Sequence, residues 1–88
     1  MKQDFIIELN AENNFSVLNR IINILNRRRV RVKKLVATEA ENDFRRGSVV
    51  MTVHTTIDMV EKVKAQIEKV IEVETVIYKQ KEVQQLSK

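Results

Sequence analysis

Residues 12–38 contain the pattern that most constrains the fold, because apolar residues at helical spacing are followed directly by residues that alternate as in a strand. After Asn14, apolar residues recur at spacings of three and four, which gives a helix one continuous apolar face. Asn13 and Asn14 can cap the free N–H groups of its first turn, and Arg27–Arg29 place positive charge where the helix dipole is negative. The sequence therefore predicts an amphipathic helix that is chemically marked at both ends.

Four strands are predicted from apolar alternation along the chain. The first covers residues 3–10, and the second follows the helix directly at Val30–Thr38, with a bulge near Lys34 where its alternation slips. The third covers residues 48–54 and the fourth residues 73–78.

A second helix is predicted between the last two strands. Thr55 and Asp58 form a capping-box pattern, and apolar residues then recur at helical spacing as far as Ile71. The polar segment 39–47, which ends in the single glycine of the chain, is predicted to connect the second and third strands as a hairpin.

This order of elements predicts an α+β fold of the ferredoxin-like βαββαβ type. Right-handed crossovers place both helices on one face of a four-stranded antiparallel sheet. We expect a single domain over residues 1–78 and a loose polar tail over residues 79–88. The other face of the sheet stays uncovered, and the apolar residues expected there are Ile6, Val36, Val50 and Val76.

Composition narrows the possible functions. A chain of 88 residues builds only a small core, so we expect it to associate with a partner. It has no cysteine and therefore no disulfide or thiolate metal site. The N-terminal apolar run is too short for a signal peptide or a membrane span, so the expected compartment is the cytoplasm.

Positive charge is concentrated in one place. Residues 27–34 hold six of the sixteen lysines and arginines, and the rest of the chain has ten basic against twelve acidic residues. Such a patch can dock an acidic protein partner, bind nucleic acid, or simply remain solvated.

Residues for catalysis are scarce. His54 is the only histidine and has no second histidine or cysteine with which to form a metal site or a nucleophile pair. A single glycine excludes a glycine-rich phosphate loop. We expect no catalytic residues and no metal site. RNA binding on the sheet would need exposed aromatics, whereas Phe5 belongs to the core set, so only the basic patch favours it.

The stretch from Glu12 to Leu35 resembles the opening of an ACT domain, and specifically that of the small regulatory subunits of acetolactate (acetohydroxyacid) synthase. Residues 69–76, KVIEVETV, resemble the final helix-to-strand passage of the same family. The matching positions of the first stretch are Glu12, Asn13, Val17, Leu18, Arg20, Arg27, Arg28, Val30, Val32 and Leu35.

The resemblance implies a binding site for a small amino acid, such as a branched-chain amino acid, against the first strand-to-helix turn. Three positions depart from the family pattern: Ser16 replaces the turn glycine, Arg29 the glycine after the helix, and Arg31 an asparagine that helps to hold the effector. Feedback by an amino acid is therefore expected to be weak or absent. The candidate effector residues are Asn13, Asn14, Phe15, Ser16, Val17 and Arg31.

The resemblance also implies a regulatory role without catalysis. The chain would form a homodimer through a sheet edge or the open face, and would activate the catalytic large subunit in branched-chain amino acid synthesis. Thiamine diphosphate, FAD and magnesium would belong to that partner. The candidate docking residues are Arg27, Arg28, Arg29, Lys33 and Lys34. The alternatives are a free-standing ACT module that senses an amino acid, and a nucleic-acid-binding ferredoxin-like domain.

Overall fold

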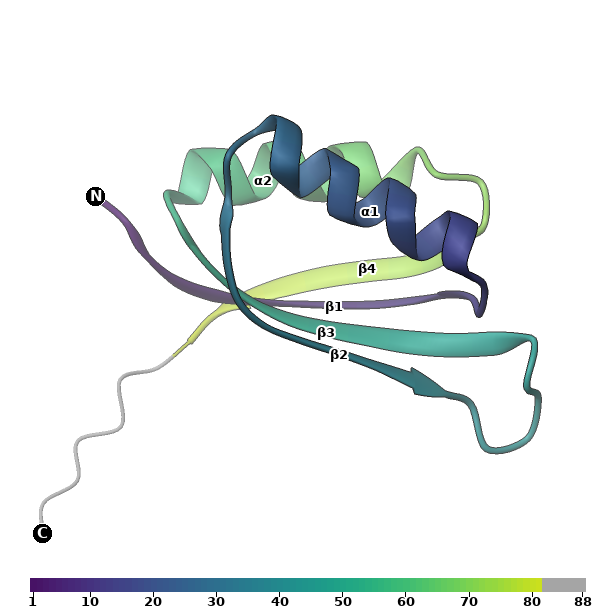
Figure 1. The fold of residues 1–88 in the computed structure, drawn as a ribbon. Helices are drawn as coiled ribbons and strands as arrows, with labels where there is room; N and C mark the ends of the chain where they lie inside the picture. The colour runs from purple at the N-terminus through teal and green to yellow at the C-terminus, as the bar shows by residue number, and fades with distance from the viewer. Residues whose placement is uncertain (82–88) are drawn as a thin grey trace, which may run out of the picture.

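The computed structural model describes residues 1–81, which form one antiparallel sheet covered on one face by two helices (Figure 1). The elements follow the predicted order, which confirms the ferredoxin-like fold. They are β1 (Gln3–Glu12), α1 (Phe15–Arg27), β2 (Arg31–Glu39), β3 (Arg46–Thr55), α2 (Ile57–Glu68) and β4 (Val73–Gln80).

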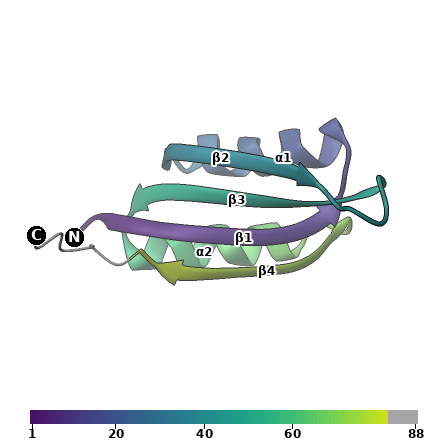
Figure 2. The ribbon, with the colours of Figure 1, turned by 90° about the horizontal axis from the view of Figure 1, so that it is seen from below.

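The first strand lies inside the sheet. The strand order is β2-β3-β1-β4, so β1 separates two strands that come much later in the chain (Figure 2). β1 pairs with β3 over its whole length, from Gln3 opposite Thr55 to Glu12 opposite Arg46. β2 and β4 are therefore the edge strands.

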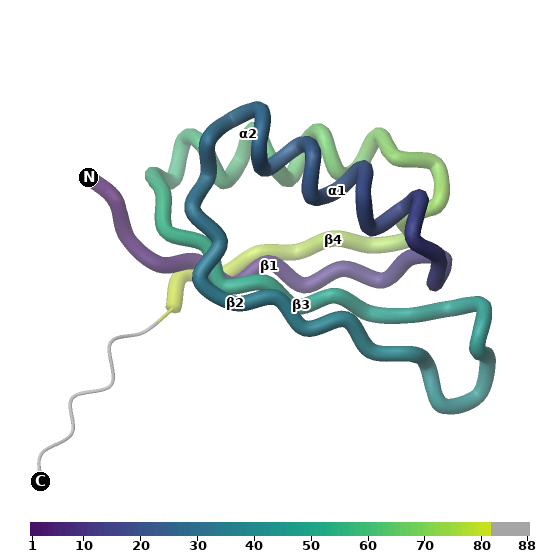
Figure 3. Tube along the Cα trace, viewed as in Figure 1, coloured from purple at the N-terminus to yellow at the C-terminus, as the bar shows by residue number. Residues whose placement is uncertain are grey.

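The core lies between the sheet and the two helices, which run along the same side of it (Figure 3). α1 buries Val17, Ile21 and Leu25 of the predicted apolar face, and Leu18 and Ile24 are partly buried beside them. Burying a side chain of this size contributes about 1.5–3 kcal/mol relative to leaving it exposed. The other fully buried side chains are Phe5, Ile7, Leu9, Met51, Val53, Val60, Val63 and Ile67.

The uncovered face of the sheet carries exposed apolar side chains, as predicted, but Val76 is not among them. Val36 and Val50 are exposed there, whereas Val76 is 6% exposed and pairs with Leu9 on the core face. The pairing of β1 with β4 shifts between Asn10 and Ala11, which resets the alternation of β4. The place predicted for Val76 is taken by Ile77.

Two further details of the prediction can be compared with the structure. The pairing of β2 with β3 shifts between Val32 and Lys34, which confirms the predicted bulge. The predicted cap Thr55 is wrong, because Thr55 is buried at the end of β3 and its neighbour Thr56 caps α2, accepting from the N–H of Met59.

The chain end differs slightly from the expectation. β4 continues to Gln80, two residues into the predicted tail, and residues 82–88 lie outside the described part. Over residues 1–81, neither helix is long and apolar enough to cross a bilayer.

Candidate functional site

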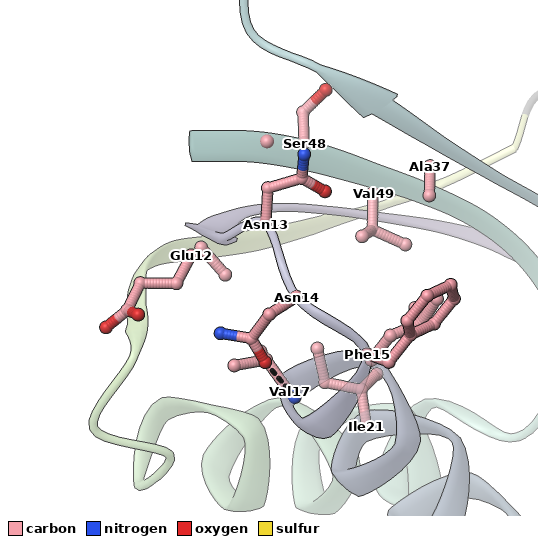
Figure 4. Close-up of a pocket in the computed structure, with 12 residues that line it drawn as sticks. Glu12, Asn13, Asn14, Phe15, Val17, Ile21, Ala37, Ser48 and Val49 are labelled. Carbon is pink, nitrogen blue, oxygen red and sulfur yellow. Dashed lines mark hydrogen bonds between the residues drawn. The ribbon is translucent and has the colours of Figure 1, made fainter. Parts of the chain in front are cut away.

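A cavity of about 330 Å³ opens where β1 turns into α1 (Figure 4). We call it the turn cavity. It is bounded by the end of β1, the first turns of α1, and the adjacent part of β3 with one residue of β2. Its lining residues are Ala11, Glu12, Asn13, Asn14, Phe15, Val17, Leu18, Ile21, Ala37, Gly47, Ser48 and Val49.

The start of α1 supplies the polar side of the turn cavity. Asn14 caps the helix: its Oδ1 accepts from the N–H of Val17 at 3.0 Å. The N–H groups of Phe15 and Ser16 take part in none of the hydrogen bonds within residues 1–81. Unpaired N–H groups at the positive end of a helix favour an anionic ligand such as a carboxylate.

Asn13 holds this turn against the β2–β3 hairpin. Its backbone N–H donates to the carbonyl of Arg45 at 2.8 Å, and its Nδ2 donates to the carbonyl of Phe44 at 3.0 Å. The helix start is thereby fixed to a loop more than thirty residues away in sequence.

Gly47 permits the close approach of three segments at the cavity. A Cβ at this position would lie 3.0 Å from the carbonyl oxygen of Thr38 and 3.3 Å from Cβ of Asn13. The wall beside it is apolar, with buried Val17, Ile21 and Val49. The turn cavity therefore suits a small ligand with an apolar side and an anionic end.

The structure brings together four of the six candidate effector residues. Asn13, Asn14, Phe15 and Val17 line the turn cavity, and Ser16 lies in the same helical turn but outside the lining. Arg31 is separate: it begins β2 opposite His54, at the other end of the sheet.

Sequence reasoning missed the β2 and β3 residues of the turn cavity. Ala37, Gly47, Ser48 and Val49 reach it only because β3 pairs with both β1 and β2. No local signal in the sequence points to them.

A second cavity, of about 490 Å³, lies at the opposite end of the sheet between the end of α1 and the start of α2. We call it the basic cavity, because four of its eight lining residues are lysine or arginine. Its lining residues are Lys2, Arg28, Arg29, Arg31, His54, Thr55, Thr56 and Met59.

The candidate docking residues are divided between two surfaces. Arg28 and Arg29 line the basic cavity, at the end of α1 where Arg27 is the last helical residue. Lys33 instead lies on β2, where its Nζ donates to Oδ2 of Asp4 at 2.8 Å, and exposed Lys34 follows it.

Within residues 1–81, the carboxyl of Asp4 has the pKa that departs furthest from its ordinary value. The hydrogen bond from Lys33 and then that from His54 lower the pKa of its carboxyl from 3.8 to about 2. This cluster lies on the uncovered face of the sheet, so His54 has a structural partner there. Over residues 1–81, no three acidic or histidine side chains come together as a metal site.

The sequence profile of the ACT domain matches residues 13–76, most of the chain, so this protein belongs to the ACT domain family. ACT domains are regulatory, non-catalytic modules. No curated protein matches the chain.

Solved structures share the fold at low sequence identity. The ACT domain of GTP pyrophosphokinase from Chlorobium tepidum superposes with a TM-score of 0.75 at 15% identity, covering 89% of this chain and 99% of that one. The small subunit of acetolactate synthase from Thermotoga maritima gives 0.75 at 20% identity, covering 86% of this chain and 47% of that one. A homoserine dehydrogenase from Thiobacillus denitrificans gives 0.75 at 20% identity, covering 91% of this chain and 17% of that one.

Proposed function

We propose that this chain is a non-catalytic regulatory subunit of acetolactate synthase, acting in the cytoplasm on the catalytic subunit of branched-chain amino acid synthesis. The family membership supports a regulatory role. Two observations support the assignment to acetolactate synthase in particular. The E-N and R-R motifs at residues 12–13 and 27–28 resemble those of its small subunits. The fold is also similar to that of the acetolactate synthase small subunit, of which this chain spans about half.

The turn cavity is the main structural observation that supports the proposed regulatory role. It combines unpaired N–H groups at the start of α1 with an apolar wall, which matches the carboxylate and side chain of a small aliphatic amino acid. Such a ligand would bridge α1 and the β2–β3 hairpin, because residues of both line the cavity.

Feedback through this cavity is proposed to be weak. Ser16 stands where the family pattern has a glycine, and its side chain lies in the first turn of α1 beside the lining residues Phe15 and Val17, where a glycine would let a ligand approach the backbone more closely. Arg31 points to the same conclusion, because it lies at the other end of the sheet from the turn cavity.

The uncovered sheet face is the proposed contact surface. Val36, Val50 and Ile77 are 44%, 39% and 58% exposed on it, with Lys33 and Lys34 at its β2 edge. Exposed apolar residues on one face favour association. We propose that this face or a sheet edge holds a second copy of the chain and that the catalytic subunit docks beside it.

The mechanism would be a shift of populations in the catalytic subunit. A non-catalytic partner activates an enzyme only by as much as it binds the active arrangement more tightly than the inactive one. Thiamine diphosphate, FAD and magnesium would be held by the catalytic subunit, and this chain would contribute contacts alone.

The test is acetolactate formation by the catalytic subunit of the same organism, with and without this chain. We expect a several-fold increase in rate with the wild-type chain and loss of most of it with Ile77→Thr, which alters the exposed face. The matched control Ile71→Thr removes an isoleucine that is 93% exposed, outside the sheet. No stimulation and no co-elution with the wild-type chain would contradict the proposal.

A second candidate function is amino acid sensing by a free-standing module. The turn cavity favours it, because the cavity is complete within one chain. A thermal shift produced by valine, leucine or isoleucine in the absence of any partner would favour this function.

A further inference from the structure

The basic cavity has the composition of an anion-binding site. Three arginines and one lysine line a space of about 490 Å³, and no acidic residue is among the residues that line it. This volume lies within the range of about 300–1,000 Å³ that is usual for small-molecule sites. None of the ion pairs within residues 1–81 involves these four cations, so their charge is not neutralised by the described part of the chain.

The backbone of Arg29 is held in an unusual conformation at this cavity. Arg29 has φ 55, which makes it the only non-glycine residue with positive φ in the described chain. The N–H of Arg29 donates to the carbonyl of Asn26, and that of Val30 donates to the carbonyl of Leu25. This is the Schellman motif, in which the left-handed position is usually glycine. Arginine therefore has a conformational cost at this position that glycine would not have.

A threonine on the cavity wall is a second, independent observation. Thr55 is 6% exposed, it lines the basic cavity, and its hydroxyl takes part in no side-chain hydrogen bond within residues 1–81. Thr55 occupies the core face at the end of β3 and lines the cavity beside Thr56. This hydroxyl is not among the buried polar atoms that lack a partner in residues 1–81, so it keeps contact with solvent and is available to donate to a ligand oxygen.

Neighbouring contacts orient the cavity wall. Nε of Arg28 donates to Oε1 of Gln66, which holds the Arg28 side chain along α2. His54 contacts Asp4 through Nδ1, and Lys33 takes the other oxygen of Asp4, so this carboxylate is occupied on the uncovered face. The basic cavity therefore keeps an excess of positive charge.

We propose that the basic cavity binds a phosphorylated small molecule, with Arg29 and Arg31 contacting its phosphoryl oxygens. Guanidinium groups match phosphoryl oxygens in bidentate geometry, and several neighbouring cations favour a di- or polyphosphate over a single carboxylate. This site is separate from the turn cavity and does not depend on the proposed partner.

The test is isothermal titration of the full chain with inorganic pyrophosphate at 150 mM salt, with inorganic phosphate and glutamate as comparison ligands. Pyrophosphate is expected to bind more tightly than phosphate. Glutamate is not expected to bind in the basic cavity, so it should not compete with pyrophosphate. Arg29→Ala combined with Arg31→Ala is expected to weaken pyrophosphate binding at least tenfold, and Thr55→Val to weaken it several-fold.

The matched control is Lys62→Ala with Lys69→Ala, which removes two exposed charges from α2 and its end, outside the cavity. This double variant is expected to bind pyrophosphate with an affinity within twofold of that of the wild-type chain. Absence of pyrophosphate binding by the wild-type chain at 10 mM would overturn the proposal. The proposal would also be overturned if the lysine control pair weakened pyrophosphate binding as much as the arginine pair does. Tighter binding of a mixed-sequence RNA, weakened equally by the lysine pair and the arginine pair, would have the same meaning. Either result would indicate a non-specific attraction to the overall positive charge.

Discussion

Nδ1 of His54 lies 2.7 Å from Oδ1 of Asp4, and the two residues face each other as register partners in β3 and β1. Lys33 contacts the second oxygen of the same carboxylate from β2. Three strands are thus joined by one acidic side chain on the uncovered face, beside the bulge that displaces Lys33 from the regular alternation.

Asp4 is expected to make stability depend on pH in the acid range. Its pKa in the folded chain is about 2 against an ordinary 3.8, so the ionised form stabilises the fold above about pH 4. This contribution is lost as the pH falls from about 4 to about 2. Asp4→Asn should therefore be less stable than wild type at pH 6, and the difference should shrink toward pH 2. Urea unfolding at several pH values measures it, with Glu41→Gln as the control for loss of an exposed carboxylate.

Arg29→Gly is expected to stabilise the chain. The left-handed conformation costs a residue with a Cβ about 1 kcal/mol that glycine does not incur. The free energy of unfolding in urea should rise by up to about 1 kcal/mol, the flexibility of glycine in the unfolded chain reducing the gain. Arg29→Ala keeps the Cβ and should show no such gain, and an equal rise in both variants would contradict the argument. Both variants should bind pyrophosphate more weakly than wild type.

Gly47→Ala is expected to destabilise the chain, because the added Cβ would press on the backbone carbonyl of Thr38 at 3.0 Å. Overpacking of this kind costs about 1–3 kcal/mol. The thermal unfolding midpoint should fall by several degrees. Ser48→Ala at the next residue provides the control, and a midpoint of Gly47→Ala equal to wild type would show that β2 moves aside freely.

Ser16→Gly is expected to strengthen amino acid binding at the turn cavity. It removes the side chain at the start of α1 while leaving the backbone N–H groups available. The thermal shift produced by 10 mM valine should be larger in this variant than in wild type. Asn19→Gly, an exposed position further along α1, controls for the general cost of glycine in a helix, about 1 kcal/mol. Equal valine shifts in wild type and Ser16→Gly would argue against ligand binding at this turn.

Local patterns were sufficient to predict the element order and the main core face of α1. The buried residues of α1 repeat at a fixed spacing, and the bulge beside Lys34 shows directly as a break in alternation. Such features depend on neighbours in sequence, so they can be recognised without knowing which strands pair.

Features that depend on long-range pairing were not predictable in the same way. Val76 was assigned to the wrong face because the shift that resets β4 lies in its pairing with Asn10 and Ala11, more than sixty residues away. Thr55 and Thr56 can each cap a helix. Thr55 belongs to β3 because it pairs with Gln3, which leaves Thr56 as the cap of α2. Arg31 was grouped with the effector residues by resemblance, whereas the sheet places it at the opposite end.

The position of β1 has a consequence for how the chain is made. β1 is synthesised before both of its neighbours in the sheet, which are the third and fourth strands. Its first edge stays unpaired until Arg46–Thr55 has been synthesised, and its second until Val73–Gln80 has followed. Because contacts so distant in sequence form slowly, the nascent chain leaves Phe5, Ile7 and Leu9 without their partner strands until β3 and β4 have been made. A chain that stops before β4 would therefore be expected to aggregate.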